Sequence, residues 1–404
     1  MGQLPDGRTV FVWNTLPGEV VNIRFIKQKR NFAEAIAEEI VQASSYRVAP
    51  REANYLATSP WQIMSFKAEN SYKKDIIKEL FLQHKVSLPI AFELANGTFE
   101  WQYRNKMEYS FWGDDDGLHL ALHKRGSHGK QAVGGSELAM PAIDEAARNI
   151  CTFLDQANVR AGDLKTIIVR STQQGQVAAS LFVKPTTFFE FVSPRNVQGL
   201  RVYHSNPKSP ASVATRLLYE LGDSTLEDEL LGKTFAYDVD SFFQVNVPMF
   251  ELALGRIQEH CQADELVDMY AGVGSIGLSV AKRGVELIEL DPATANMARL
   301  NAKNFNLDAR VTEASTERVL DFIMHDKSII VDPPRAGLHD KVVEKVLEAL
   351  PPQVVYLSCN PATQARDLAQ LQAAYEIKHF EAFNFFPRTP HIETLAVLSR
   401  RENL

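Results

Sequence analysis

Three short motifs in the C-terminal third of the chain contain residue types suited to covalent and proton-transfer chemistry. Cys359 stands in a Ser-Cys-Asn-Pro turn, Asp332 begins an Asp-Pro-Pro-Arg turn, and Glu393 lies in a His-Ile-Glu-Thr segment. A cysteine thiolate is a strong nucleophile, and a nearby carboxylate can accept a proton. Each motif adjoins an apolar run typical of a buried strand. We therefore expect the three side chains to converge at one edge of a sheet.

The residues that follow Cys359 predict a reactive thiol. Asn360 is a favourable helix cap and Pro361 a favourable first helical residue, so a helix should begin directly after the cysteine. The positive end of that helix would lower the thiol pKa below its usual value of about 8.5. The alternative is a buried, inert cysteine.

The two prolines after Asp332 predict a stiff loop that directs the carboxylate into a pocket, where it could read the N–H and C=O edge of a base. The alternative for this motif is a simple turn at the end of a strand.

A glycine-rich segment, Asp268–Gly277, predicts a cofactor site. It follows a short apolar run and precedes a helical pattern, so Gly272 and Gly274 should form a tight turn that lets a ligand approach the backbone. Glu289 ends the next strand, where a carboxylate can accept hydrogen bonds from ribose hydroxyls. The glycines alone also fit a structural turn or a nicotinamide dinucleotide, because Gly277 is in register for a third glycine.

The elements around these motifs predict an α/β catalytic domain. From about residue 264, strands alternate with helices, which indicates a mostly parallel sheet with ligands beyond the carboxyl ends of its strands. The expected strands are ELVDMY (265–270), a run ending at Glu289, 309–312, a run within SIIVDPP (328–334), VVYLS (354–358), 375–383 and 392–400, with helices after each of the first five.

The N-terminal half reads differently. Residues 9–50 alternate apolar and polar positions around Pro17-Gly18, which predicts a small β-barrel. The following segment predicts helices at 66–85 and 141–157, and strands within 98–135 and at 165–170 and 176–184. We therefore expect three domains: a barrel at 1–50, a mixed α+β domain at 51–240 and the catalytic domain at 241–404.

Composition restricts the partners of the chain. The 404 residues carry a formal net charge of −7, so any nucleic-acid surface must be local. One basic run, Arg24, Lys27, Lys29 and Arg30, could be such a surface or a solvated strand face.

The three widely spaced cysteines argue against a disulfide framework and a metal site. No apolar run is long enough to span a bilayer and the N-terminus lacks a secretory pattern, so we expect a cytoplasmic protein without a membrane partner.

The motifs, in their order, resemble those of the RNA uracil-5-methyltransferase family. The resemblance covers nearly the whole chain: RNKMEYSF (104–111), SFFQVN (241–246), DMYAGVGSIGL (268–278), Glu289 with Pro292 and Asn301 downstream, DPPRAGL (332–338), SCNP (358–361) and HIETLAVL (391–398). Residues 9–50 also resemble the TRAM domain, an RNA-binding barrel. The resemblance implies a class I, S-adenosylmethionine-dependent fold and an RNA partner that presents a uridine in a single strand or loop.

By this resemblance, Cys359 is the nucleophile that adds to carbon 6 of uracil, and Glu393 is the general base that removes the proton from carbon 5. Asp332 holds the base, and the cofactor-binding positions are Gln244, Tyr270, Gly272, Gly274, Glu289 and Asp332. Arg24 to Arg30 would contact RNA. A TRAM-like barrel favours ribosomal RNA, with transfer RNA as the alternative. We expect a monomer.

Two departures from the family pattern carry expectations of their own. Many TRAM-bearing relatives hold a 4Fe–4S cluster with four cysteines between the barrel and the middle region. The matching stretch here, YLATSPWQIMSF, has none, so we expect no cluster. Many relatives contact the adenine amine with an acidic or amide residue after the third strand. The matching segment here is Thr312–Ser315 and contains Ala314, which leaves that contact unassigned.

Three other functions fit parts of the sequence. Methylation of an exocyclic nitrogen uses a similar proline-rich loop, but it usually has an aromatic residue where this chain has Arg335, and it needs no cysteine. A non-catalytic RNA-binding protein would not need Cys359 or Glu393. A dinucleotide-dependent dehydrogenase is supported by the glycine turn alone.

Overall fold

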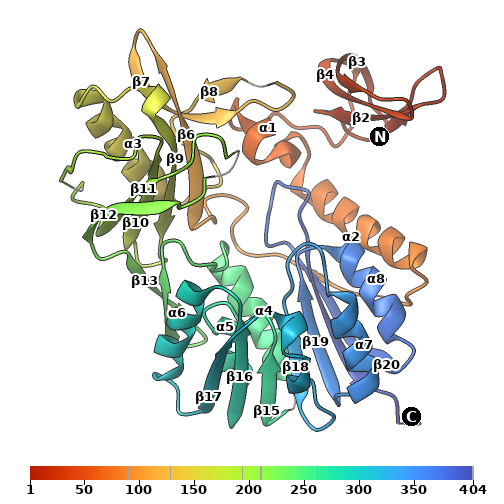
Figure 1. The fold of residues 1–404 in the computed structure, drawn as a ribbon. Coiled ribbons are helices and arrows are strands. Elements are labelled where there is room, and N and C mark those ends of the chain that lie inside the picture. The colour runs from red at the N-terminus through yellow and green to blue at the C-terminus, as the bar shows by residue number, and fades with distance from the viewer. Residues whose placement is uncertain (90, 128, 193, 210–211, 262, 403–404) are drawn as a thin grey trace.

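The computed structural model describes residues 1–89, 91–127, 129–192, 194–209, 212–261 and 263–402, which form four β-sheets and the helices that pack on them (Figure 1). The N-terminal sheet lies at one end of the molecule. A seven-stranded sheet and an eight-stranded sheet make up the two larger units, and a two-stranded hairpin lies between them.

The N-terminal unit is a four-stranded sheet with the order β1-β2-β4-β3. Its strands are β1 (Gly2–Gln3), β2 (Thr9–Trp13), β3 (Val20–Gln28) and β4 (Phe32–Gln42). Buried and exposed positions alternate along β4, and its alanines form a small core with Val10. Gly18 in the expected turn has a φ of +81°, which glycine adopts without strain. The β-structure expected for residues 9–50 is confirmed, and its assignment as a TRAM barrel stays a prediction.

The central unit is a seven-stranded sheet with the order β12-β11-β10-β9-β6-β7-β8. The bounds are β6 (Lys106–Asp114), β7 (Gly117–His123), β8 (Lys130–Ala132), β9 (Leu164–Ser171), β10 (Val177–Val183), β11 (Gly199–His204) and β12 (Arg216–Gly222). The amphipathic helix α3 (Pro141–Gln156) begins with a proline and packs its buried face on this sheet. Ile143, Ile150 and Leu154 there contact the same core as Tyr109 and Leu181.

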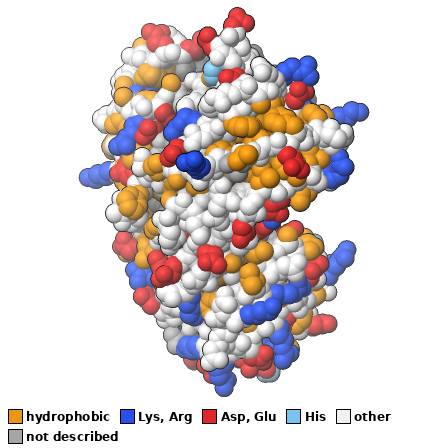
Figure 2. Space-filling model, turned by 90° about the vertical axis from the view of Figure 1, so that its left-hand side faces the viewer, with side chains coloured by type: hydrophobic (Ala, Val, Ile, Leu, Met, Phe, Trp, Pro, Cys, Tyr) orange, Lys and Arg blue, Asp and Glu red, His pale blue; other side chains and the backbone are white. Residues whose placement is uncertain are grey.

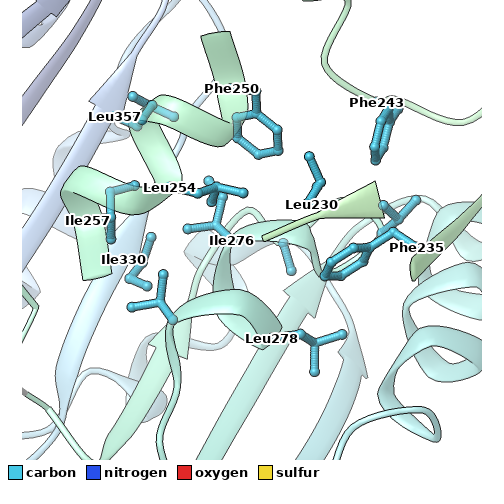
Figure 3. Close-up of a cluster of buried hydrophobic side chains, with 14 of the residues drawn as sticks. Leu230, Phe235, Phe243, Phe250, Leu254, Ile257, Ile276, Leu278, Ile330 and Leu357 are labelled. Atoms are coloured by element: carbon cyan, nitrogen blue, oxygen red, sulfur yellow. The ribbon is translucent and has the colours of Figure 1, made fainter. Parts of the chain in front are cut away.

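A hairpin and a helix connect the central unit to the catalytic sheet. The hairpin consists of β13 (Thr225–Leu230) and β14 (Lys233–Asp238), and α4 (Val247–His260) follows it. Leu230 and Phe235 of the hairpin, with Phe250 and Leu254 of α4, lie in one hydrophobic core with Ile276 (Figure 3). The loop between the hairpin and α4 contains Gln244, so this core fixes one wall of the expected site.

The C-terminal unit is an eight-stranded sheet with the order β17-β16-β15-β18-β19-β21-β20-β5. Its strands are β15 (Glu265–Asp268), β16 (Gly284–Glu289), β17 (Asp308–Glu313), β18 (Ser328–Val331), β19 (Gln353–Ser358), β20 (Tyr375–Phe383) and β21 (Glu393–Arg400), with β5 (Leu94–Ala95) added at one edge. The helices are α5 (Ser275–Val280), α6 (Pro292–Ala302), α7 (Asp340–Ala349) and α8 (Pro361–Leu371). The first five strands in the spatial order pair in parallel, whereas β21 runs antiparallel to both neighbours. The expected α/β fold is confirmed.

Several local expectations differ from the structure. The helix expected after the third strand is replaced by two 3-10 turns, Thr316–Arg318 and Leu320–Phe322. Strands β11 to β14 and helix α4 were not anticipated. The segment 66–95 was assigned to the central domain, yet α2 (Phe66–Gln83) packs on α8 and β5 pairs with β20 of the catalytic sheet. The apolar residues of α2, including Ile77 and Phe81, bury themselves in the catalytic core. The three domain ranges stay a prediction.

A buried ion pair ties α2 to the chain that leads into β21. Lys73 is fully buried, and its Nζ donates to Glu69 Oε1 at 2.9 Å, to Asn384 Oδ1 at 2.6 Å and to the Phe386 carbonyl at 3.1 Å. Burial lowers the pKa of Lys73 to about 8, although Glu69 opposes this shift. The segment from Asn384 onward precedes Glu393, so the pair fixes the approach to the expected base.

The surface bears charges of both signs. The side of the molecule shown in Figure 2 has hydrophobic side chains gathered on its upper half, with acidic and basic side chains interspersed. No extended field of one sign covers that side. This mixed distribution of charges agrees with the net charge of −7. A polyanion would therefore have to bind at a local cluster of basic side chains.

We expect Lys73→Met to lower the free energy of unfolding by about 3 kcal/mol, because it removes the nearer of the two cations of the buried Glu69 carboxylate and leaves only Arg388 at 4.0 Å. Chemical denaturation measures this change. Lys78→Met on the exposed side of α2 is the control and should cost under about 0.5 kcal/mol. Equal stability of the two variants would contradict a structural role for the pair.

Candidate active site

Strand pairing places Cys359 beside Glu393. Ser358, the last residue of β19, pairs with Thr394 of the antiparallel strand β21, so the next position along each strand brings Cys359 opposite Glu393. Residues opposite one another in antiparallel strands have Cα atoms roughly 4.5–5.5 Å apart. Cys359 is half-buried, and Glu393 is 1% exposed. The sulfur is therefore neither sealed in an apolar core nor fully exposed to solvent.

Asp332 completes the group from the neighbouring strand β18. It follows Val331, which pairs with Tyr356 of β19, so Asp332 and Cys359 leave the same edge of the sheet. Gln244 Nε2 donates to Asp332 Oδ2 at 3.4 Å, and the Gln244 carbonyl accepts from Asn105 Nδ2 at 3.0 Å. The structure thus brings together the four side chains expected at the chemical site: Cys359, Glu393, Asp332 and Gln244.

Three carboxyl groups lie in a row across this edge, and each is harder to ionise than usual. Burial raises the pKa of Asp268 to about 7 and that of Asp332 to about 7, and Asp268 raises Asp332 further. Burial, and then the Asp332 charge, raise the pKa of Glu393 well above its ordinary value. Asp268 Oδ1 and Glu393 Oε1 have no hydrogen-bond partner among the described residues. The row therefore favours either protons or a cation beside it.

The pKa of Cys359 differs from the expectation. Asn360 caps α8 and Pro361 begins it, as expected, with Asn360 Oδ1 accepting from the Ala362 amide. Nevertheless, burial raises the thiol pKa to about 11, with further increases from the Glu393 and Asp332 carboxylates, whereas Arg335 lowers it. The expectation of a lowered pKa was wrong for the ligand-free protein, because burial is the main influence on the thiol and the two neighbouring carboxyl groups add to it when they ionise.

Asn360 also joins the two catalytic loops. Its Nδ2 donates to the Arg335 carbonyl at 2.8 Å, which fixes the Asp-Pro-Pro-Arg turn against the start of α8. Arg335 in turn lies 3.4 Å from the ring nitrogens of His391. Burial and then Arg335 lower the pKa of His391 to about 4, so its ring is neutral near pH 7. The positive charge of Arg335 also lowers the pKa of the Cys359 thiol.

The glycine turn and Glu289 form one connected unit. Gly272 has a φ of +56°, and its amide donates to Glu289 Oε2 at 2.9 Å. Glu289 Oε1 accepts from the Asp291 amide at 2.8 Å. Gly274 has a φ of +86° and lies so close to Leu278 that a Cβ atom would clash at 2.8 Å. The turn is therefore restricted to glycine, and Glu289 is held at the carboxyl end of β16.

A cavity of about 480 Å³ lies beyond these strand ends. Its lining includes Tyr270, Glu289, Ala314, Ser315 and Pro334. Ala314 and Ser315 thus reach the cavity at the position where many relatives have an acidic or amide residue, and the Ser315 hydroxyl has no hydrogen-bond partner among the described residues. Burial raises the pKa of Tyr270 to about 12, so its hydroxyl stays protonated.

Three residues in or near the site were given no role of their own from the sequence. Phe242 is 64% exposed, an unusual position for phenylalanine, and stands two residues before Gln244. Asp268 accepts from the Gly277 amide at 2.9 Å and belongs to the carboxyl row. Asn301 is buried and bonds to both backbone groups of Ala236 and to the Val273 carbonyl. Two features of the sequence could have indicated these residues. Phe242 is an extra aromatic residue in the Phe-Phe-Gln motif, and Asn301 is a polar residue on the apolar face of a helix.

The basic residues expected to contact RNA lie on or directly after β3, away from the site. Arg24 forms a salt bridge with Glu38 at 2.5 Å, and Lys27 lies 3.8 Å from Glu34. Lys29 and Arg30 are exposed at the turn after the strand. Exposed ion pairs of this kind are weak and can exchange for phosphate. RNA contact by the four residues stays a prediction.

Comparison with known proteins decides the family. Residues 65–401 match the family model described as tRNA (uracil-5-)-methyltransferase. The chain belongs to this family. It is 30% identical to an RNA methyltransferase from Lactiplantibacillus plantarum, over 98% of this chain and 93% of that one. It is 27% identical to an RNA methyltransferase from Enterococcus faecalis, over 98% and 93% of the two chains.

The fold agrees with a solved structure. The Pyrococcus abyssi tRNA (uracil-54, C5)-methyltransferase in complex with S-adenosyl-L-homocysteine superposes with a TM-score of 0.77, covering 98% of each chain at 23% identity. The enzyme is an RNA methyltransferase and uses S-adenosylmethionine, so the expected fold class, enzyme class and cofactor are confirmed.

The residues of the methyltransferase fit this cofactor. S-adenosylmethionine carries a positively charged sulfonium, and the row of carboxyl groups with two unpartnered oxygens lies beside the glycine turn. In the described ranges no helix is long and apolar enough to cross a membrane. Within the same ranges, no three His, Cys, Asp or Glu side chains are grouped to hold a metal ion. The absence of an iron–sulfur cluster stays a prediction.

The charges around Cys359 predict opposite effects on its reactivity in the methyltransferase. Glu393→Gln removes a carboxyl group whose ionised form raises the thiol pKa, so alkylation by iodoacetamide at pH 8 should become faster, by about threefold or more. Arg335→Gln removes the cation that lowers it, so alkylation should become slower. Mass spectrometry of the Cys359 peptide measures both rates, and the more buried Cys151 and Cys261 serve as internal controls. Shifts in the same direction would contradict this electrostatic picture.

Proposed function

We propose that the enzyme methylates carbon 5 of a uridine in RNA through a covalent adduct between Cys359 and carbon 6 of the base. The observation that carries the proposal is the pairing of Ser358 with Thr394, which puts a half-buried thiol beside a buried carboxyl group. Carbon 5 of uracil is a poor nucleophile, and addition of a thiolate at carbon 6 makes it electron-rich. Methylation of an exocyclic nitrogen needs no such pair.

The residues supply each step of this reaction. Cys359 forms a bond to carbon 6, and the ring electrons move onto carbon 5 and the adjacent carbonyl. The cofactor supplies an electrophilic methyl group. Glu393 then takes the proton from carbon 5, the electron pair restores the ring double bond, and Cys359 leaves as a thiolate. Asp332 and Gln244 hold the polar edge of the base, and the exposed Phe242 provides a surface on which the base stacks.

The raised pKa values fit a site that is switched on by its ligands. Without ligands, Asp332 and Glu393 ionise reluctantly and the thiol is protonated. The carboxyl groups lose their protons more readily beside a sulfonium cation, because the opposite charge offsets their burial. The thiol loses its proton to solvent before addition, because Glu393 must remain ionised to accept the proton from carbon 5.

The class of RNA is open between two candidates. The N-terminal sheet, interpreted from sequence as a TRAM-like barrel, favours ribosomal RNA. The family description and the structural relative named for uracil-54 of tRNA favour transfer RNA. In either case the base must leave its stack to reach Cys359, which points to a uridine in a loop or single strand.

Substitution of the two central residues tests the reaction. Cys359→Ala should abolish formation of 5-methyluridine, lowering the rate by at least about 10³-fold, while S-adenosylhomocysteine still binds in a titration. Glu393→Gln should accumulate a covalent protein–RNA adduct that survives denaturing electrophoresis, because methylation proceeds but elimination does not. Glu393→Gln with a normal turnover rate would refute its role as the base. Mass-spectrometric mapping of transfer and ribosomal RNA from cells with and without the gene identifies the substrate.

The rate should also depend on pH in a specific direction. Glu393 must be ionised to accept the proton and its pKa is raised, so the single-turnover rate should increase as pH rises from about 6 to about 8. Rapid-quench measurements with saturating cofactor test this. Glu313→Gln, at an exposed carboxylate, is the control and should leave the profile unchanged. A rate that falls over this interval would contradict the assignment.

A further inference from the structure

One face of the seven-stranded sheet is covered by α3, and much of the other face has no helix on it. Helix α3 lies against one face of the sheet (Figure 1). The inward residues of β6, β7, β9 and β10, such as Tyr109 and Ile167, form the core under it. Alternate residues point to the opposite face. The hairpin β13–β14 packs against the start of β10 on that face, where Ala178 joins the hydrophobic core of the catalytic unit.

A cavity of about 460 Å³ lies on the uncovered part of this face. Ser110 of β6 pairs with Thr166 of β9 and with Ala121 of β7, and His123 pairs with Lys130 of β8, so these residues share the face. All five line the cavity, which is closed by further side chains that include Glu108, Lys165, Lys184 and Ser212.

Three ammonium groups share this cavity. Lys130, Lys165 and Lys184 are all half-buried. Burial lowers the pKa of Lys130 and of Lys165, and in both cases the charge of Lys184 lowers it further. Mutual repulsion of this kind means that the cations are close enough to act on one anion together.

The partners of these lysines are mainly uncharged. Lys130 Nζ donates to the Phe111 carbonyl at 3.1 Å, and Lys184 Nζ donates to the Gly162 carbonyl at 2.8 Å. Neither has a carboxylate within 4.0 Å in the described part of the chain. Lys165 Nζ donates to Ser205 Oγ at 3.0 Å and to the Asn206 carbonyl at 3.1 Å. The charges of Lys130 and Lys184 are thus positioned by neutral groups, whereas Glu108 raises the pKa of Lys165.

The cavity is connected to the active site along β6. The Asn105 amide donates to the Val245 carbonyl at 2.9 Å, and its side chain holds the Gln244 carbonyl. Ser110 follows five residues later on an extended strand, roughly 17 Å away. Lys106 lies between them on the same face, and burial and then the Arg170 charge lower its pKa to about 8. The lysines therefore lie within reach of an RNA strand that extends a few nucleotides from the active site.

Acidic residues limit the direction of this path. Asp114 to Asp116 form the tip of the β6–β7 hairpin beyond the cavity, and they repel phosphate there. Glu108 is exposed between Lys106 and Ser110 and weakens the local positive charge. The site is therefore bounded on the far side and open toward the catalytic loop.

We infer that Lys130, Lys165 and Lys184, with the hydroxyls of Ser110 and Thr166, form a binding site for backbone phosphate of the substrate RNA, a few nucleotides from the methylated base. This inference rests on RNA being the substrate, which family membership supplies. It does not depend on carbon 5 chemistry or on Cys359. The site adds affinity without reading sequence, because phosphate contacts position an RNA strand and base contacts specify it.

The test measures binding of a fluorescent single-stranded oligouridylate as a function of salt. Lys130→Gln/Lys165→Gln/Lys184→Gln should bind about tenfold more weakly near 0.1 M salt, and the slope of log K against log salt should shrink by up to about 2, since each lost phosphate contact contributes about 0.7. The control is Lys78→Gln/Lys282→Gln/Lys303→Gln, which removes three exposed charges elsewhere. Glu108→Gln should bind more tightly than the wild type. Because binding is the readout, failure of the proposed methylation chemistry would not alter the result.

Two outcomes overturn the inference. One is a cavity triple variant that matches the control in both affinity and slope. The other concerns the wild type: an amine-reactive reagent should modify Lys130 and Lys184 more slowly when the oligouridylate is bound, and unchanged modification rates would refute contact. The second measurement needs no variant, so it decides the question even if the triple substitution prevents folding.

Discussion

The site depends on carboxyl groups that the fold forces out of water. Asp268, Asp332 and Glu393 stand at the ends of β15, β18 and β21, three strands near the centre of one sheet, and burial is the main cause of the raised pKa of each. A buried anion without a counter-charge is costly. If the cationic cofactor binds beside these groups, as we propose, its binding favours their ionisation. In the ligand-free protein the three carboxyl groups are harder to ionise than exposed ones.

Positioning of these groups depends on distant parts of the chain. Glu393 is set by the antiparallel strand β21, whose approach is held by Lys73 and Glu69 of α2. Gln244 is set by the hairpin and α4, through the core around Phe250, and by Asn105 at the start of β6. Helix α2, the hairpin with α4, and β21 are each more than a hundred residues apart in the sequence, yet all three support one pocket. The packing of α2 on the catalytic sheet is part of this support.

The sequence predicted the local structure of its motifs and the alternation of strands and helices, because both are local. Ser-Cys-Asn-Pro specifies a strand end, a cap and a helix start, and all three occur. The placement of residues 66–95 was not predictable, since it depends on which surface buries Ile77 and Phe81. The prediction that the pKa of Cys359 is lowered was wrong for a related reason. The helix that begins after Cys359 can be predicted from the sequence, whereas the burial of the thiol and its neighbouring carboxyl groups depend on the order of the strands. The lysines of the central cavity come from β8, β9 and the end of β10. They are far apart in the sequence and form no basic run, so the sequence did not predict that they lie together.

These observations suggest a division of labour in the binding of a polyanion by an acidic protein. The active site itself is rich in carboxyl groups, which repel phosphate and favour the cationic cofactor. Positive charge is instead placed on the open face of the central sheet and on β3, at a distance from the chemistry. An RNA backbone held on those surfaces can present one extruded uridine to Cys359 while its phosphates avoid the carboxyl row. Separation of the two charge types lets one protein bind a cation and a polyanion at the same time.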